Sequence, residues 1–390
     1  MSILLLIRRT LLMLCMICYD SRSLAINMTS CPVSQCTCSK ENVISCSSRS
    51  LDRVPHFHSS PYNLIFKSLD LSSNSIESLP ANAFHNIKLQ AISFQGNPLI
   101  GISPRAFTGL GNTMEILDMS ETGVVVMHWG VLRSLRVLRH LDISSNRMFA
   151  LPVGIFDGLA SLKHLTLAWN KISIIKIGYF RHLTTLLNLN LAGNLITHIE
   201  PGSFENLIAL EMLNLDSNQL KQINPLSLQG LGSLGSISLA ENNIQEVPSA
   251  IFVLLHLMRS INLAKNNISI VYSRAFSGAI FLEHVHLNQN TIYNVPSDAF
   301  YGLTRLKTLR LDDNQLQTLG EDCILRGIEK SVLDLNLWNN PIDCTCRIAW
   351  IHRLTEKGSN VQGHCMSPQA FTGVQIAKLN FTLCQFYDCH

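Results

Sequence analysis

The stretch LLNLNLAGNLITHIEPGSF, residues 186–204, contains one copy of an apolar frame that recurs along the chain. In a β-strand, Leu189 and Leu191 project to one face while Asn188 and Asn190 project to the other, because successive side chains alternate. Asn194 follows where the strand must end. The stretch therefore predicts a short strand with one apolar and one polar face, closed by a turn.

The frame, L-x-x-L-x-L-x-x-N-x-L, returns with an asparagine at the same place, and its step from Asn146 to Asn314 is always 24 residues. The residues at that place, here named the ladder residues, are Asn74, Asn97, Thr122, Asn146, Asn170, Asn194, Asn218, Asn242, Asn266, Asn290, Asn314 and Asn340. A period of about 20–29 residues with this frame is the signature of a leucine-rich repeat horseshoe. Amphipathic helices do not fit, since their stripe has a 3.6-residue period. We expect an α/β solenoid with a parallel concave sheet, a mostly irregular or short-helical convex side, and disulfide caps at both ends.

Two further rows belong to the frame. A buried turn leaves peptide groups that need partners, and an asparagine amide supplies both donors and an acceptor. Thr122 interrupts the row of asparagines, so we expect the ladder to be weakest there. Phe94 stands at a leucine position of the frame, which indicates local repacking. The return segments carry phenylalanines that should stack as a spine on the convex side, namely Phe84, Phe107, Phe156, Phe180, Phe204, Phe252, Phe276 and Phe300.

Composition and the first residues indicate an exported chain. The 390 residues are 47% hydrophobic and 15% charged, enough for one long domain whose core is buried between neighbouring repeats. Residues 1–25 resemble a secretory signal peptide, with Arg8 and Arg9 before an apolar run that is short for a spanning helix. Without these residues the chain has 27 basic and 26 acidic side chains and is nearly neutral, so we expect no strong attraction to nucleic acid. We expect a secreted protein without a membrane span. The alternative is that a shortened gene model or splice form has lost a downstream membrane anchor.

Cysteines gather at the two ends of the repeats, where a solenoid needs covering. One cluster holds Cys31, Cys36, Cys38 and Cys46, and the other holds Cys344, Cys346, Cys365 and Cys384. Disulfides stabilise small segments of exported proteins that lack their own core, whereas zinc is the alternative for clustered cysteines. Cys323 and Cys389 stand outside both clusters and could pair together, pair between chains or stay free.

The two clusters resemble the cysteine-rich flanks of extracellular leucine-rich repeat proteins. This resemblance implies the bridges Cys31–Cys38 and Cys36–Cys46 and leaves the pairing in the second cluster open. It divides the chain into a leader (1–25), a first flank (26–60), repeats (61–339) and a second flank (340–390). The segment CMSPQAFTG, residues 365–373, is similar to the closing cap of chondroadherin-like matrix members, which implies a matrix or adhesion role.

The polar side of the strands should form the binding surface. An exposed indole is typical of interface hot spots, so Trp169 is the favoured contact, although it could merely shield the sheet. The expected contacts are Asp118, Asp142, His164, Trp169, Asn190, Asn214, Asn262, His286 and Arg310, acidic near the start and weakly basic toward the end. The expected partner is an extracellular protein, of the matrix or a cell surface, with a glycan or lipid as the alternative.

Histidines suggest two other readings. His284 and His286 share a strand face, and His140 and His164 occupy equivalent places in successive repeats. No acidic or cysteine side chain is placed to complete a metal site, so we expect no metal and no cofactor. A contact tuned by acidity is the remaining alternative, since histidine titrates near neutral pH.

The chain has no sequence motif of catalysis, and we expect no enzyme activity. The competing functions are innate immune recognition of microbial molecules and a role as regulatory or carrier subunit of an extracellular enzyme or hormone complex. Three N-x-S/T sequons, at Asn27, Asn267 and Asn380, predict glycosylation, with Asn267 pointing outward beside a ladder residue.

Overall fold

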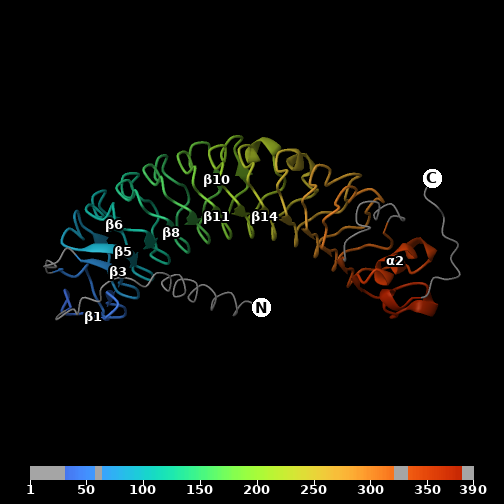
Figure 1. Ribbon diagram of the computed structural model, residues 1–390, viewed down its shortest axis with the longest axis horizontal. Coiled ribbons are helices and arrows are strands. Elements are labelled where there is room, and N and C mark those ends of the chain that lie inside the picture. The colour runs from blue at the N-terminus through green and yellow to red at the C-terminus, as the bar shows by residue number, and fades with distance from the viewer. Residues whose placement is uncertain (1–30, 58–63, 320–332, 380–390) are drawn as a thin grey trace.

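The computed structural model describes residues 31–57, 64–319 and 333–379, which form an arch of stacked coils (Figure 1). Its main sheet contains fifteen strands and follows the inner side of the arch. The predicted horseshoe is therefore confirmed. Several predictions fall outside the described residues: the leader (1–25), Asn27, Cys323, Asn380, Cys384 and Cys389.

Twelve parallel strands of the main sheet come from the repeats, one from each copy of the frame. They are β3 (Ile65–Asp70), β5 (Lys88–Ser93), β7 (Ile116–Asp118), β8 (His140–Asp142), β9 (His164–Thr166), β11 (Asn188–Asn190), β13 (Met212–Asn214), β14 (Ser236–Ser238), β15 (Ser260–Asn262), β16 (His284–His286), β17 (Thr308–Arg310) and β18 (Asp334–Asn336).

The two flanks extend this sheet at its ends. The first flank adds β1 (Thr37–Cys38), which is antiparallel to β2 (Val43–Ser45), and β2 pairs with β3 in parallel. At the other end β19 (Asn360–Gln362) pairs in parallel with β18. The second flank also contains the helix α2 (Trp350–Glu356) and the 3₁₀ turns η5 (Cys346–Ile348), η6 (Gln369–Phe371) and η7 (Ile376–Lys378). The flanks thus cover the terminal strand edges that an open sheet would expose.

The outer side of the arch is mostly turns. Two short parallel pairs lie there, β4 (Ser78–Leu79) with β6 (Gly101–Ile102) and β10 (Ile174–Ile175) with β12 (His198–Ile199). The outer side also contains the 3₁₀ turns η2 (Pro225–Leu228) and η3 (Ser249–Val253). No helix within the described ranges combines the length and apolar character required to cross a membrane.

The ladder residues hold successive coils together. The Asn194 amide donates to the Leu191 carbonyl in its own turn (2.9 Å) and to the Leu167 carbonyl one repeat earlier (3.0 Å). Its oxygen accepts from the backbone N–H of Ile172 (3.1 Å). The side chain is 4% exposed, so these bonds satisfy peptide groups that water does not reach.

Thr122 makes fewer such bonds than Asn194. Its hydroxyl lies 2.9 Å from the Met119 carbonyl and 3.0 Å from Oδ1 of Asn146, and one hydroxyl hydrogen serves only one acceptor at a time. The backbone carbonyl of Thr122 instead accepts from the N–H of Leu99 in the preceding repeat (3.0 Å). The side-chain link to that repeat is therefore missing at Thr122.

The predicted phenylalanine spine is present but interrupted twice. All eight rings are at most 1% exposed, and neighbouring ring centroids lie 5.9 Å apart for Phe84 and Phe107 and 5.3 Å apart for Phe276 and Phe300. Among the described return segments, two lack the ring, and buried leucines, Leu132 and Leu228, take its place. Phe94, in its leucine position, packs edge-on against Phe84 and extends the aromatic cluster.

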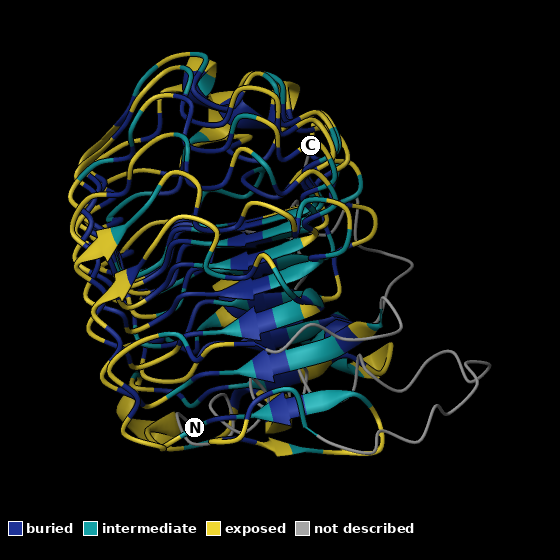
Figure 2. Cartoon of the chain, turned by 90° about the vertical axis from the view of Figure 1, so that its left-hand side faces the viewer, coloured by how far each residue is buried: buried dark blue, intermediate teal, exposed yellow. Residues whose placement is uncertain are grey.

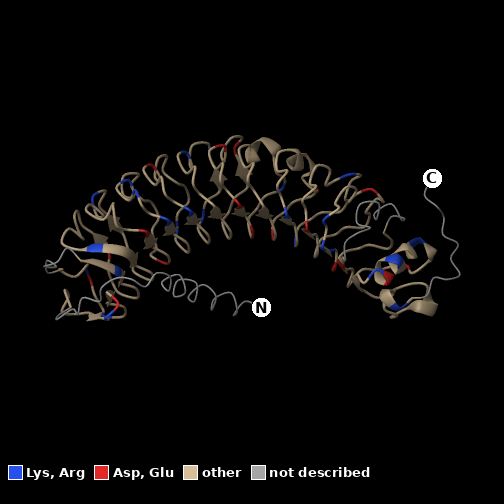
Figure 3. Ribbon diagram, viewed as in Figure 1, with Lys and Arg blue, Asp and Glu red and all other residues tan. Residues whose placement is uncertain are grey.

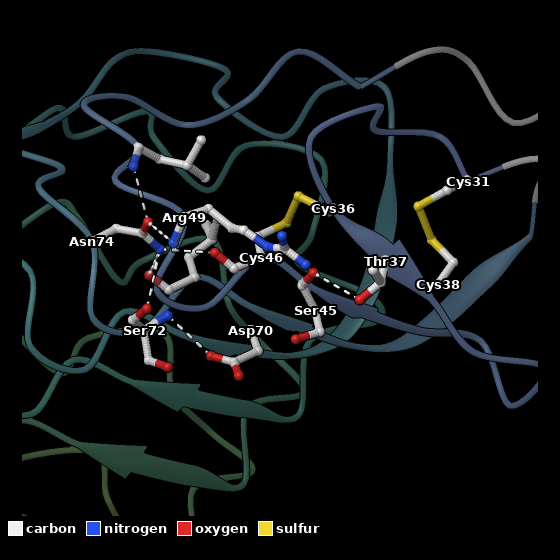
Figure 4. Close-up of a disulfide and its surroundings, with 12 residues drawn as sticks. Cys31, Cys36, Thr37, Cys38, Ser45, Cys46, Arg49, Asp70, Ser72 and Asn74 are labelled. Atoms are coloured by element: carbon white, nitrogen blue, oxygen red, sulfur yellow. Dashed lines mark hydrogen bonds between the residues drawn. A yellow bond between two sulfur atoms is a disulfide. The ribbon is translucent and has the colours of Figure 1, made fainter.

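Disulfides close both flanks. The first contains Cys31–Cys38 and Cys36–Cys46, the pairing that the family resemblance implied, and the second contains Cys344–Cys365. Cys346 is disulfide-bonded as well. Figure 4 shows Asn74 beside Cys46, whose carbonyl accepts from the asparagine amide (2.9 Å). The first ladder residue thus ties the disulfide-bonded flank to the repeats.

Candidate functional site

Two columns of side chains line the concave side of the sheet, because each strand presents the same frame positions in register. The Asp142 column contains the residues paired across β7 to β17, namely Asp118, Asp142, Thr166, Asn190, Asn214, Ser238, Asn262, His286 and Arg310. The His164 column contains the residues two places earlier, including Ile116, His140, His164, Asn188 and Met212. Figure 2 shows the strands buried at their middle residue and partly exposed on either side.

The charges predicted at the two ends of the Asp142 column are largely engaged within the chain. Asp118 is only 7% exposed and accepts from the hydroxyls of Ser93 (2.9 Å) and Ser120 (2.7 Å). Arg310 binds Asp312 through two hydrogen bonds of 2.8 and 3.0 Å. Asp118 is therefore not available as a contact, and the expected change from acidic to basic along the column is weak. Charged residues are scattered along the arch with no long run of one sign (Figure 3).

Between Asp142 and Asp216 the concave side carries no charged side chain in either column or in the following turn. We name this area the central patch, formed by His140, His164, Thr166, Trp169, Asn188, Asn190, Met212 and Asn214. Trp169 is 55% exposed and Met212 is 51% exposed, while the other members are partly buried. The patch thus combines two accessible apolar side chains with amides, imidazoles and a hydroxyl.

The two histidines of the central patch stack on each other. The rings of His140 and His164 lie 4.5 Å apart between centroids and are inclined by 5°. The Asn188 amide lies 2.8 Å from Nδ1 of His164, which accepts its hydrogen bond when that nitrogen is unprotonated. Burial, and then the charge that His164, Arg139 and Lys163 place nearby, lowers the pKa of His140 to about 4. Burial also lowers the pKa of His164, so the stack is uncharged at neutral pH.

Trp169 occupies the turn position just before a ladder asparagine, where the backbone is left-handed in every repeat from Ser73 (φ 54°) to Asn339 (φ 54°). Its own φ is 57°. This conformation turns the side chain out of the strand, and the indole extends over Gly193 of the next repeat. Trp169 therefore both covers its neighbour and stays accessible. This backbone conformation could not be predicted from residue type, since ten of the twelve repeats have a residue other than glycine there.

The second histidine pair lies apart from the central patch. His284 and His286 belong to β16 and are partly buried, and Nδ1 of His284 lies 3.1 Å from the Thr308 hydroxyl. Burial is the main reason that the pKa of His286 is lowered. Within the residues that the structure describes, no three histidine, cysteine, aspartate or glutamate side chains are grouped so as to hold a metal ion.

Comparison with known proteins identifies relatives of parts of the chain. Leucine-rich repeat-containing protein 3 of Danio rerio is 36% identical over 114 residues, which are 28% of this chain and 39% of that protein. Leucine-rich repeat-containing G-protein coupled receptor 5A of Xenopus laevis is 37% identical over 114 residues, 27% of this chain and 12% of the receptor. The chain thus matches well under half the length of these relatives.

Among solved structures, a chain in the octameric complex of Latrophilin 3, Unc5D and FLRT2 (LRR) is similar, with a TM-score of 0.68 and 25% identity. The similarity covers 91% of this chain and 100% of that chain. The Leucine rich repeat family pattern matches residues 66–121, 112–172, 136–196, 184–244 and 281–342. These matches include more than half of the residues. Most of the repeating strands and ladder residues lie within them, while β15 and Asn266 lie between two of the matched ranges. The chain is a member of the leucine rich repeat family.

Proposed function

We propose that this chain is an extracellular binding protein that holds a protein partner against its concave side, with the central patch as the main contact. The observation that carries the proposal is the accessible Trp169 beside two columns that have no charged side chain between Asp142 and Asp216. Large aromatic side chains contribute strongly to protein interfaces, and charged residues are depleted from interface cores because their desolvation is costly.

The size and rigidity of the surface also support a macromolecular partner. Twelve strands at about 4.8 Å spacing give a concave sheet on the order of 50 Å long, enough for a typical protein interface of roughly 800 Å² per partner. Its side chains are carried by a hydrogen-bonded sheet whose turns are fixed by the ladder residues, so little ordering is needed on binding.

Four observations support an extracellular location. The bridges Cys31–Cys38, Cys36–Cys46 and Cys344–Cys365 are of a kind that persists in oxidising compartments. The first 25 residues have the pattern of a secretory leader, and the 365–373 cap is similar to that of chondroadherin-like matrix proteins. Among the similar proteins, one is named a G-protein coupled receptor and one structure is a multiprotein complex. We therefore propose a partner in the matrix or on a cell surface.

The test uses the secreted chain with a photo-crosslinking amino acid at Asn190 or Asn214, incubated with extracellular fluid and with cultured cells. We expect both positions to crosslink the same protein, and Trp169→Ala to reduce its recovery at least tenfold. Tyr293→Ala is the matched control, because Tyr293 is 54% exposed against 55% for Trp169 but lies outside the concave columns. Equal recovery with both substitutions would overturn the concave contact. Recovery of glycan or lipid without protein would replace the protein partner.

A further inference from the structure

A second surface lies on the outer side of the arch, where the first half of the repeats exposes apolar side chains. The outer patch consists of Val125, Val126, Phe149, Val153, Ile174 and Ile177, whose exposed fractions are 46, 61, 58, 59, 37 and 56%. These residues follow the ladder turns of three consecutive repeats, and Ile174 belongs to the outer strand β10. Soluble proteins seldom leave a large apolar area uncovered unless it contacts something.

Hydrogen bonds between repeats hold these segments side by side. The N–H of Arg147 donates to the Val124 carbonyl (2.9 Å), and the N–H of Lys171 donates to the Met148 carbonyl (2.8 Å). The N–H of Ile177 donates to the Glu200 carboxylate in the following repeat (2.8 Å). Aligned coils therefore bring the six apolar side chains into one area.

At the places of Phe149, Val153 and Ile177, later repeats carry mainly polar residues or proline, with the exposed Tyr293 as the exception. Phe149 and Val125 have equivalents at Thr197, Lys221, Gln245, Ser269, Tyr293 and Gln317, and Val153 and Ile177 have equivalents at Pro201, Pro225, Ser249, Ser273 and Ser297. The buried frame positions remain apolar throughout, so burial in the solenoid does not require exposed apolar residues at these places.

Cations border the outer patch. Arg147 and Lys171 directly follow ladder asparagines, Lys176 lies between Ile174 and Ile177 in sequence, and all three are exposed. No ion pair within the described part of the chain involves them, whereas the nearby acids are engaged: Asp157 binds Arg181 (2.6 Å), and Glu200 accepts from Ile177. The border thus has an excess of positive charge that the chain does not balance.

From this combination we infer that the outer patch docks an acidic, apolar polypeptide segment of a partner protein. The apolar side chains of such a segment cover Phe149 and Val153, and its carboxylates meet Arg147, Lys171 and Lys176. This contact uses residues separate from the central patch, so it stands or falls independently of the proposed concave function. Charge complementarity of this kind favours fast association and selects against basic segments.

The test selects a phage-displayed library of random twelve-residue peptides on the purified chain and counter-selects it on Lys171→Glu/Lys176→Glu. We expect peptides rich in Asp, Glu, Leu and Phe, whose fluorescein-labelled forms bind more weakly as salt rises. Phe149→Ser/Val153→Ser, a second and uncharged variant, should weaken these peptides at least tenfold. Lys221→Glu and Tyr293→Ser are matched controls at the equivalent place in later repeats and should leave binding within twofold.

Three results would overturn the inference. The first is that no selected peptide binds both the charge variant and the apolar variant more weakly than the parent chain, or that the selected peptides are basic or uncharged. The second is that vesicles of phosphatidylcholine and phosphatidylserine bind in a variant-sensitive way while no acidic peptide does, which would assign the patch to a lipid surface. The third is that the unmodified chain dimerises in sedimentation and both variants are monomeric, which would assign it to a second copy of the chain. A matching thermal midpoint for all variants shows that they remain folded.

Discussion

The indole of Trp169 lies over the backbone of Gly193, which occupies the same frame position one repeat later. A methyl group added at Gly193 would lie 2.5 Å from Cδ2 and 2.9 Å from Cζ3 of the indole. The exposed aromatic ring of one repeat therefore depends on the absence of a side chain in the next.

Gly193→Ala should destabilise the chain and displace the indole. The left-handed backbone alone (φ 67°) should cost roughly 1–2 kcal/mol in the free energy of unfolding, and the clash adds to it. Gly123→Ala is the control, because Gly123 has a φ of 73° and nothing within 4 Å of the added methyl. In urea titrations, Gly193→Ala should lose more stability than Gly123→Ala, and Trp169→Ala should remove the difference. Equal losses in the parent chain would show that the indole moves freely.

Replacement of ladder residues should reveal the weaker link at Thr122. Asn194→Ala leaves the buried N–H of Ile172 and the Leu167 carbonyl without their side-chain partner, at a cost on the order of 3 kcal/mol in the free energy of unfolding. Thr122→Ala removes only one hydroxyl and should cost roughly 1 kcal/mol. Thermal unfolding of both variants provides the comparison, and a loss at Thr122 as large as that at Asn194 would refute the difference.

Stability should fall in mild acid because of the stacked histidines. The pKa of His140 is about 4 in the folded chain, against 6.5 for an unperturbed histidine. Between these two pH values the unfolded chain therefore binds a proton that the folded chain does not. The stabilising difference is complete above pH 6.5 and declines as the pH falls toward about 4. Calorimetry at pH 7.5 and pH 5 should show a smaller loss of midpoint for His140→Gln than for the parent chain. His198→Gln, at an exposed position outside the concave columns, should behave like the parent.

Asn267 should carry a glycan when the chain is secreted from animal cells. Its side chain is exposed, and Ser269 completes the sequon. Asn267→Gln and Ser269→Ala should each reduce the apparent mass by one glycan in gel electrophoresis, and glycosidase should abolish the difference from the parent. Unchanged mobility of both variants would exclude modification there.

Most of the fold could be predicted because one frame decides it. The spacing of Leu189, Leu191 and Asn194 predicts a strand, its buried face and the turn that follows. Because the same unit repeats along the chain, stacking of its copies predicts the horseshoe. The flank pairing came from a family resemblance, since spacing alone does not select one among several possible bridges.

The site was predictable only in part. The alternation within each strand correctly placed Asn190 and Asn214 on the concave side, yet it gave no measure of how far Asp118 would be buried by Ser93 and Ser120. Side-chain hydrogen bonds between repeats join residues 22 to 26 positions apart, and a pattern within one strand does not predict them. The outer patch was missed because Val126 and Ile177 are hard to distinguish from core residues in a sequence that is 47% hydrophobic.

The constant 24-residue step between Asn146 and Asn314 has a consequence for how such a chain can evolve. Duplication or deletion of one whole unit would join coils whose facing groups are of the same type, so hydrogen bonding and core packing would continue across the junction. Each event would change the reach of the arch by about one strand spacing of 4.8 Å. Gene duplication could thus adjust the span available to a partner in discrete increments while both disulfide-bonded ends stay unchanged.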